Sequence, residues 1–197
     1  MIHAIATWIA SVFVLYGESS EEDADIYAYG LEAVIAALFN IVISLFISFL
    51  FRGVVEGIIF VLVFALLRRF TGGYHADTHY KCVLTFCALL TFAMLITSFV
   101  PEFRGSIIIT FIIAIFSWIG IFVLAPIDDK GKSYSDEFRA TLKKKSIAVS
   151  TLFLVICIIF GLVFSIYVAL ILALAMFSVF GGMVYELMRR SILGVSK

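Results

Sequence analysis

The chain has 197 residues, a formal net charge of zero, 63% hydrophobic residues and 14% charged residues. Soluble domains average about half apolar and about a quarter charged residues, so this composition excludes an ordinary soluble protein and indicates an integral membrane protein. With 21 phenylalanines and 2 prolines, the composition favours long helices over a turn-rich sheet. A length of 197 residues suits one domain, so residues 1–197 are predicted to form a single domain. No nucleic-acid partner is predicted.

Residues 1–25 are predicted to form an interfacial helix followed by an acidic linker. In the apolar stretch 2–16, His3, Thr7 and Ser11 recur every four residues and so share one helical face. Trp8 suits the headgroup boundary of a bilayer. We therefore expect an amphipathic helix along the membrane surface, and we interpret the stretch GESSEEDAD at 17–25 as a solvated linker.

Six later segments are apolar enough to suggest membrane spans, each of which needs about 20 residues to cross the hydrocarbon core. The second of them is short and carries Glu56. The predicted fold is an all-α, polytopic bundle over 31–185, with six transmembrane helices at 31–51, 53–67, 82–100, 106–125, 146–163 and 165–185.

Basic residues predict the orientation of these spans, because cytoplasmic connections are enriched in lysine and arginine. The connections after the second, fourth and sixth spans are basic, whereas the opposite connections hold only Arg52 and Arg104. We therefore predict that both termini lie in the cytoplasm, together with residues 72–82 and a basic loop at 126–145. The clustered basic residues are Arg68, Arg69, Lys81, Lys130, Lys132, Arg139, Lys143, Lys144, Lys145, Arg189, Arg190 and Lys197.

The stretch GGYHADTHYKC at 72–82 is the densest group of reactive side chains in the sequence. One interpretation is a polar loop between spans. A second is a metal site, because histidine, aspartate and cysteine all have ligand chemistry; the spacing matches no familiar zinc pattern, so no metal or cofactor is predicted. The third is a cysteine nucleophile, which needs a nearby base and donors for an oxyanion.

Cys82 is the candidate nucleophile of this stretch. If Asp77 or Thr78 caps the following helix, Cys82 falls in or just beyond its first turn. A helix N-terminus and the neighbouring Lys81 both favour a thiolate. Gly72 and Gly73 permit backbone conformations that aim N–H groups at a developing negative charge.

Two histidines compete for the role of the base. His79 and Cys82 are i and i+3 on a continuous helix and therefore neighbours. His75 and Cys82 are i and i+7, about 10 Å apart along the axis, so His75 serves only if the chain turns back. Spacing alone slightly favours His79.

The stretch RRFTGGYHADTHYKC, with the later APIDDK and lysine-bearing segment, closely resembles the accessory gene regulator B (AgrB) family. The resemblance implies a membrane cysteine endopeptidase of Gram-positive bacteria, placed in the cell membrane. Such a protein removes the C-terminal tail of an AgrD-type precursor peptide through a cysteine acyl-enzyme. The peptide then closes into a thiolactone or lactone ring that serves in quorum sensing. A non-catalytic membrane exporter of a small peptide remains the alternative.

The resemblance also implies roles for single residues. It makes Cys82 the nucleophile and His75, rather than His79, the base. Arg68 and Gly73 match functional positions, with Gly72 beside them as oxyanion or substrate support. Asp77 is a candidate to orient the base, and His79 becomes a neighbour of the site. The family's lysine loop implies that Lys143, Lys144 and Lys145 bind an acidic peptide tail, and the family suggests a homodimer in the lipid bilayer.

Overall fold

The computed structural model describes residues 2–15, 24–73, 79–99, 104–128 and 135–192. All regular structure within these residues is helical, as predicted, and no strand is found among them. The helices are α1 (Ile2–Leu15), α2 (Ala24–Leu50), α3 (Val54–Thr71), α4 (His79–Phe99), α5 (Arg104–Leu124), α6 (Asp136–Ile159), a π-helical segment η2 (Phe160–Phe164) and α7 (Ile166–Ile192).

Five of the described helices are long and apolar enough to cross a membrane: α2, α4, α5, α6 and α7. The remaining predicted span, 53–67, forms α3, a helix of 18 residues. At 1.5 Å per residue it is about 27 Å long, which is close to the thickness of the hydrocarbon core. It carries Glu56 in its first turn and Arg68 and Arg69 in its last, so its 18 residues include three charged side chains. The chain therefore fits a multi-pass membrane protein, and the count of six spans stays a prediction.

Contacts divide the chain into two compact units, residues 1–43 and 44–197. The first unit holds α1 and most of α2. Residues 2–15 are helical as predicted, and the indole of Trp8 is 67% exposed. That this helix lies along the membrane surface stays a prediction, and most of the acidic linker lies outside the described residues.

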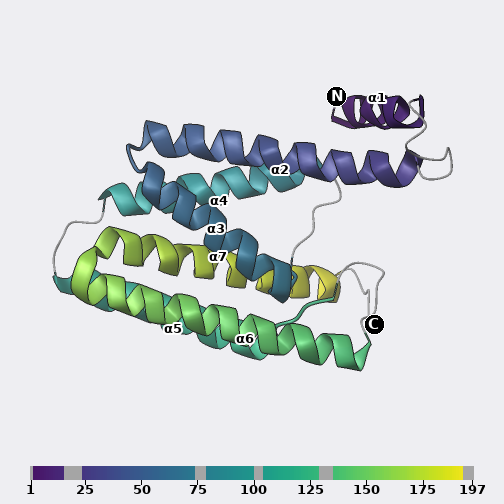
Figure 1. Cartoon of the computed structure of the whole chain (residues 1–197). Coiled ribbons are helices and arrows are strands. Elements are labelled where there is room, and N and C mark those ends of the chain that lie inside the picture. The colour runs from purple at the N-terminus through teal and green to yellow at the C-terminus, as the bar shows by residue number, and fades with distance from the viewer. Residues whose placement is uncertain (1, 16–23, 74–78, 100–103, 129–134, 193–197) are drawn as a thin grey trace. The chain divides into compact units, whose positions relative to one another are not determined.

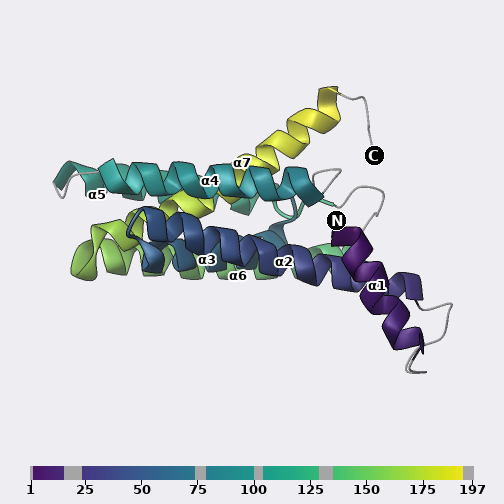
Figure 2. The ribbon, with the colours of Figure 1, turned by 90° about the horizontal axis from the view of Figure 1, so that it is seen from above.

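The second unit is built around α7, which packs against α3, α4, α5 and α6 (Figures 1 and 2). Residues 169–176 of α7 are all buried, including Leu170, Ile171 and Met176. A helix that is apolar and buried all round lies in the interior of a bundle. The last span of the sequence is therefore the central helix of this unit.

Small residues allow α5 to approach its neighbours closely. Its buried positions recur every three or four residues and so lie on one face: Ser106, Thr110, Ala114, Ser117 and Ile121. Small and hydroxyl-bearing residues are enriched where membrane helices meet, because they let the backbones come close. The hydroxyls of Thr110 and Ser117 donate within α5, to the carbonyls of Ser106 (2.8 Å) and Ile113 (2.7 Å), so they bury no unsatisfied polar group there.

The loop predicted at 126–145 is shorter than expected, because α6 begins at Asp136 and includes Lys143, Lys144 and Lys145. The physical reason is a capped and acidic N-terminus. The hydroxyl of Ser135 accepts a hydrogen bond from the backbone N–H of Phe138, and Asp136 and Glu137 occupy the first turn. An N-cap and early acidic residues stabilise the positive end of a helix dipole. The predicted lysine loop is therefore an exposed helical extension of a span.

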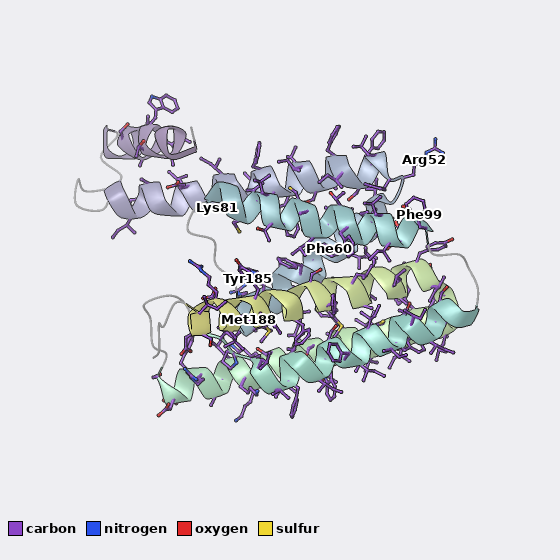
Figure 3. All side chains as sticks on the ribbon, turned by 180° about the vertical axis from the view of Figure 1, so that it is seen from behind. Arg52, Phe60, Lys81, Phe99, Tyr185 and Met188 are labelled. Carbon is purple, nitrogen blue, oxygen red and sulfur yellow. The ribbon has the colours of Figure 1, made fainter. Side chains whose placement is uncertain are left out.

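Most basic residues of this unit lie at one end of the bundle, with Arg52 and Arg104 as exceptions. Lys81 lies at the same end as Tyr185 and Met188, near the C-terminus of α7, whereas Arg52 and Phe99 lie at the opposite end (Figure 3). This arrangement agrees with the asymmetry of basic residues in the sequence. That this end faces the cytoplasm stays a prediction.

Candidate functional site

The chain leaves α3 through two glycines that form a sharp elbow. Gly72 has φ of 68° and Gly73 has φ of 119°, both in the left-handed region that favours glycine. The N–H of Gly72 donates to the carbonyl of Arg68 at 3.1 Å, which closes the last turn of α3. A side chain at Gly72 would collide with the carbonyl oxygen of Ile127. The elbow therefore needs glycine, for both its backbone angles and its close contact.

Three neighbouring elements hold this elbow in place. The N–H of Ile127 donates to the carbonyl of Thr71 at 2.9 Å. The hydroxyl of Ser146, on α6, donates to the carbonyl of Phe70 at 2.8 Å. Gly73 packs against Met183 of α7. Two of the carbonyls left free at the end of α3 thus find donors from distant parts of the chain.

Arg68 lies beside α7, one turn before the elbow. Its guanidinium carbon is 5.7 Å from the centre of the Phe64 ring. Its Nη1 atom lies next to Gly182, 3.9 Å from where a side chain would begin. The guanidinium therefore lies over α7 at Gly182, where an alanine Cβ would make only an ordinary van der Waals contact with it.

Cys82 is the fourth residue of α4, within its first turn as predicted. Its side chain is exposed, whereas Cys87 is half-buried and Cys157 is buried. The Cys157 thiol donates to the carbonyl of Ala169 at 3.2 Å, so it serves packing between α6 and α7. Cys82 is therefore the cysteine best able to meet an external molecule.

Of the two candidate bases, the structure describes only the position of His79. His75 and Asp77 lie outside the described residues. His79 is the first residue of α4, so the helix begins between His75 and Cys82. A His75–Cys82 dyad requires such a break, because on one continuous helix the two residues would be about 10 Å apart along the axis. Among the described residues no three histidine, cysteine or acidic side chains gather in a metal-binding arrangement. Since His75 and Asp77 lie outside that part of the chain, the metal-site interpretation stays open.

The three lysines of the predicted tail-binding group differ in their contacts. Lys143 Nζ donates to the carbonyl oxygens of Phe122 and of Val123, the latter at 3.2 Å, and lies 5.7 Å from the centre of the Phe122 ring. A cation at a helix C-terminus stabilises the unpaired carbonyls there. Lys144 and Lys145 are exposed. The structure thus gives Lys143 a contact with α5 that its two neighbours lack.

This difference predicts separable effects of substitution. Lys143→Met should destabilise the protein by about 1 kcal/mol, because the end of α5 loses a charged donor. If these lysines bind an acidic peptide tail as predicted, the double substitution Lys144→Met with Lys145→Met should instead weaken the binding of an acidic peptide several-fold, with stability unchanged. Thermal unfolding in detergent and peptide-binding measurements check the two effects. A stability loss in the double variant equal to that of Lys143→Met would contradict the assignment.

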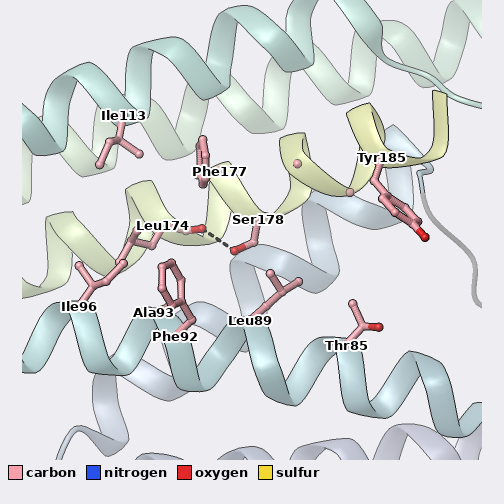
Figure 4. A pocket seen from close by; sticks show the side chains of 12 residues that line it. Thr85, Leu89, Phe92, Ala93, Ile96, Ile113, Leu174, Phe177, Ser178 and Tyr185 are labelled. Atoms are coloured by element: carbon pink, nitrogen blue, oxygen red, sulfur yellow. Dashed lines mark hydrogen bonds between the residues drawn. The ribbon is translucent and has the colours of Figure 1, made fainter. Parts of the chain in front are cut away.

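An apolar groove of about 470 Å³ lies between α4 and α7 (Figure 4). Thr85 and Leu89 line it from α4, and Ser178, Gly182 and Tyr185 line it from α7. The Ser178 hydroxyl donates to the Leu174 carbonyl at 2.8 Å, so its hydrogen is used within α7. Thr85 follows Cys82 by three residues and therefore lies on the same face of α4. The groove thus begins about one helical turn from the candidate nucleophile.

The sequence analysis gave no role in the site to Asp128, Glu186 or Arg190, which meet next to the elbow. Arg190 Nε donates to Glu186 Oε1 at 3.0 Å, and Arg190 Nη2 donates to the carbonyl oxygen of Asp128 at 2.5 Å. The spacing of Glu186 and Arg190, four residues apart in a helix, was a signal for the first of these contacts. Nothing in the sequence pattern indicated that Asp128 joins them.

Comparison with known proteins places these residues in a family context. The sequence pattern of one family, described as "AgrB: Accessory gene regulator B", matches residues 3–181. A Clostridium perfringens (strain SM101 / Type A) protein named "Putative AgrB-like protein" is 29% identical over 140 residues, which cover 68% of this chain and 65% of that protein. A Clostridium perfringens (strain 13 / Type A) protein named "Putative AgrB-like protein 2" is 27% identical over 161 residues, which cover 79% of this chain and 75% of that protein. The match therefore spans less than two thirds of the first relative, and no solved structure matches the chain.

Proposed function

Because the chain belongs to the accessory gene regulator B family, we propose that it is a membrane-embedded cysteine endopeptidase that matures a quorum-sensing peptide. Family membership supports a role in the accessory gene regulator system, in which the partner is an AgrD-type precursor. In this proposal the protein removes the C-terminal tail of that precursor. It also supports the closure of the remaining peptide into a thiolactone or lactone ring.

The observation that carries this proposal is the exposure of Cys82 in the first turn of α4. Only seven residues separate the end of α3 at Thr71 from the start of α4 at His79, and these two helices contact each other. The nucleophile and the Gly72–Gly73 elbow therefore lie at the same end of the bundle. Arg68 reaches that end from α3, where a guanidinium can pair with a carboxylate or an oxyanion.

The proposed reaction begins with attack of the Cys82 sulfur on the scissile carbonyl. His75 takes the thiol proton and returns it to the leaving amine of the tail. Backbone N–H groups near Gly73 and the guanidinium of Arg68 stabilise the oxyanion, and Asp77 orients the base. The product is a thioester between Cys82 and the N-terminal part of the peptide.

Ring closure then follows by exchange of that thioester. A thiol or hydroxyl within the peptide attacks the acyl carbon, and Cys82 leaves as a thiol. Because a thioester retains its activation, exchange to another thiol is nearly balanced in free energy, whereas attack by water would lose that activation. A site at the edge of the bilayer limits water and so favours the ring over hydrolysis. The apolar groove next to Thr85 offers space for apolar side chains of the peptide.

The remaining parts of the proposal concern placement. Both termini and the reacting residues lie on the cytoplasmic side, where lysines of α6 attract an acidic tail. The protein acts as a homodimer in the cell membrane of a Gram-positive bacterium. A non-catalytic exporter of a small peptide is the alternative, and the apolar groove is the observation that favours it.

Trapping the acyl-enzyme tests the proposal directly. Purified protein in detergent is mixed with an AgrD-type precursor whose internal cysteine is replaced by alanine, so that the ring cannot close. We expect intact-mass spectrometry to show the chain with the N-terminal fragment attached, and hydroxylamine to release it. An exporter would bind the precursor and form no adduct.

The same measurement distinguishes the histidines. Removing a general base slows proton transfer by about 10²–10⁴-fold. We therefore expect His75→Ala to lower the rate of adduct formation by about that factor, and His79→Ala to change it by less than about tenfold. Loss of the adduct in His79→Ala alone would assign the base to His79, as spacing along a continuous helix favours.

A further inference from the structure

Four charged residues form a connected group beside the elbow, which we call the ion cluster: Asp128, Arg139, Glu186 and Arg190. The carboxylate of Asp128 pairs with the guanidinium of Arg139, on α6. Arg190, on α7, donates to the Asp128 carbonyl oxygen and to the Glu186 carboxylate. The ion cluster therefore joins α6, α7 and the segment 125–128 at one point.

The two carboxylates of the ion cluster are shielded from solvent more than its two guanidinium groups are. Glu186 is only 1% exposed and the side chain of Asp128 retains 19% of its accessible surface, whereas the side chains of Arg139 and Arg190 retain 38% and 29%. Burying a carboxylate is costly unless charged partners and donors compensate. A buried arrangement of this kind is geometrically demanding, so it holds the three elements in one relative position.

The elements that the ion cluster joins are the ones that contact the elbow. Ile127, next to Asp128, donates to the Thr71 carbonyl at 2.9 Å, and its own carbonyl lies against Gly72. Met183 packs on Gly73 and lies one helical turn before Glu186 on α7. Both sides of the elbow thus rest on residues adjacent to the ion cluster.

Two acceptor atoms of the ion cluster accept no hydrogen bond within the described part of the chain. They are Asp128 Oδ1 and Glu186 Oε2, both buried, and the second of them forms an ion pair with Arg189 Nη1 at 3.9 Å. Most buried polar atoms in folded proteins have a partner, so an unsatisfied carboxylate oxygen calls for an explanation.

We propose that the ion cluster positions the Gly72–Gly73 elbow, and through it Arg68 of α3 and Cys82 of α4, for peptide cleavage. Asp128 and Glu186 are then positioning residues that act through the elbow without touching the peptide. This inference rests on the proposed function. It adds that residues near the end of α7, through the elbow, help to hold the nucleophile in position.

The test uses Asp128→Asn and Glu186→Gln, which remove a charge and preserve shape, in the full chain in detergent or nanodiscs. We expect kcat for cleavage of an AgrD-type precursor to fall about tenfold to a hundredfold, with KM changed less than twofold. Glu137→Gln is the matched control, because Glu137 is an exposed carboxylate in the first turn of α6. It should leave kcat and KM unchanged.

Rescue by charge exchange separates positioning from a general structural role. Asp128→Arg alone should be inactive, and Asp128→Arg combined with Arg139→Asp should recover a large part of the wild-type kcat. Activity that falls only in proportion to the folded fraction, without rescue, would overturn the proposal. A rise in KM at unchanged kcat would also overturn it, because it would indicate direct contact with the peptide.

Hydrogen exchange provides a readout that does not depend on catalysis. We expect amide exchange in residues 70–82 to increase in Asp128→Asn and Glu186→Gln, and to stay unchanged in Glu137→Gln. Unchanged exchange in the first two variants would overturn the positioning role while the peptidase assignment stands. Absence of cleavage by the wild-type protein would instead overturn the proposed function, whatever the exchange shows. If Asp128→Asn folds poorly, Asp128→Glu keeps the charge and should retain both activity and protection.

Discussion

Replacing Cys82 with alanine should abolish cleavage of an AgrD-type precursor while leaving the amount of membrane-inserted protein unchanged. The thiol is the proposed nucleophile, and alanine cannot form the acyl-enzyme. The side chain of Cys82 is exposed in the first turn of α4, so its loss removes no buried contact. Co-expression of the variant with a tagged precursor, followed by immunoblotting of the precursor and the protein, measures both quantities.

The other two cysteines provide the matched controls for this experiment. Cys87 lies on the same helix as Cys82 and is half-buried, so Cys87→Ala should retain cleavage. Cys157→Ala removes a buried thiol that donates to Ala169, so we expect a lower stability and unchanged cleavage for each folded molecule. Wild-type levels of cleavage in Cys82→Ala would contradict the peptidase assignment and favour an exporter.

Replacing Gly72 with alanine should strongly reduce both thermal stability and cleavage. A left-handed backbone costs a residue with a side chain about 1–2 kcal/mol, and Gly72 has φ of 68°. The new Cβ would also collide with the carbonyl oxygen of Ile127, which belongs to backbone and cannot rotate away. The segment 125–128 would have to move, and its hydrogen bond to Thr71 would be strained or lost. Thermal unfolding in detergent and cleavage kinetics measure the two effects.

Gly181 supplies the control for a glycine-to-alanine change. It lies in α7, and apart from its chain neighbours and the backbone of its own helix no described atom lies within 4 Å of the place that an alanine Cβ would occupy. Because alanine is favoured over glycine in helices by about 1 kcal/mol, Gly181→Ala should be as stable as the wild type or more stable. A Gly72→Ala variant as stable as Gly181→Ala would show that the elbow tolerates a side chain, and would contradict the geometry described for it.

The sequence predicted the positions of the helices well. An apolar run of membrane length must pair its backbone N–H and C=O groups within the segment, and a helix does so. The segments predicted at 82–100 and 106–125 form α4 and α5 within a few residues. The start of α6 was predicted wrongly: the span was expected to begin at 146, whereas the helix begins at Asp136. Its first residues are charged, as those of a loop often are, so their composition did not indicate a helix. Because α3 carries Glu56, Arg68 and Arg69, it is not among the five described helices that are apolar enough to cross a membrane.

The candidate site was predictable where it depended on local chemistry. The placement of Cys82 in the first turn of a helix followed from the polar residues before it. The need for glycine at the elbow was indicated only in general terms. That Ile127 lies against Gly72, and that Met183 lies against Gly73, depends on parts of the chain far away in sequence.

By itself, the sequence determined that this protein is helical, enters the membrane, and carries a Gly-Gly-x-His segment whose histidine lies seven residues before a cysteine in the first turn of the next helix. These properties depend on composition, on periodicity and on neighbours within a few residues. Only the tertiary structure showed that α7 is the central helix and that Lys143 donates to a carbonyl oxygen at the end of α5. It also showed that Asp128, Arg139, Glu186 and Arg190 meet beside the elbow. The physical reason is that these contacts join residues distant along the chain, and no local pattern of apolar and charged side chains specifies such a pairing.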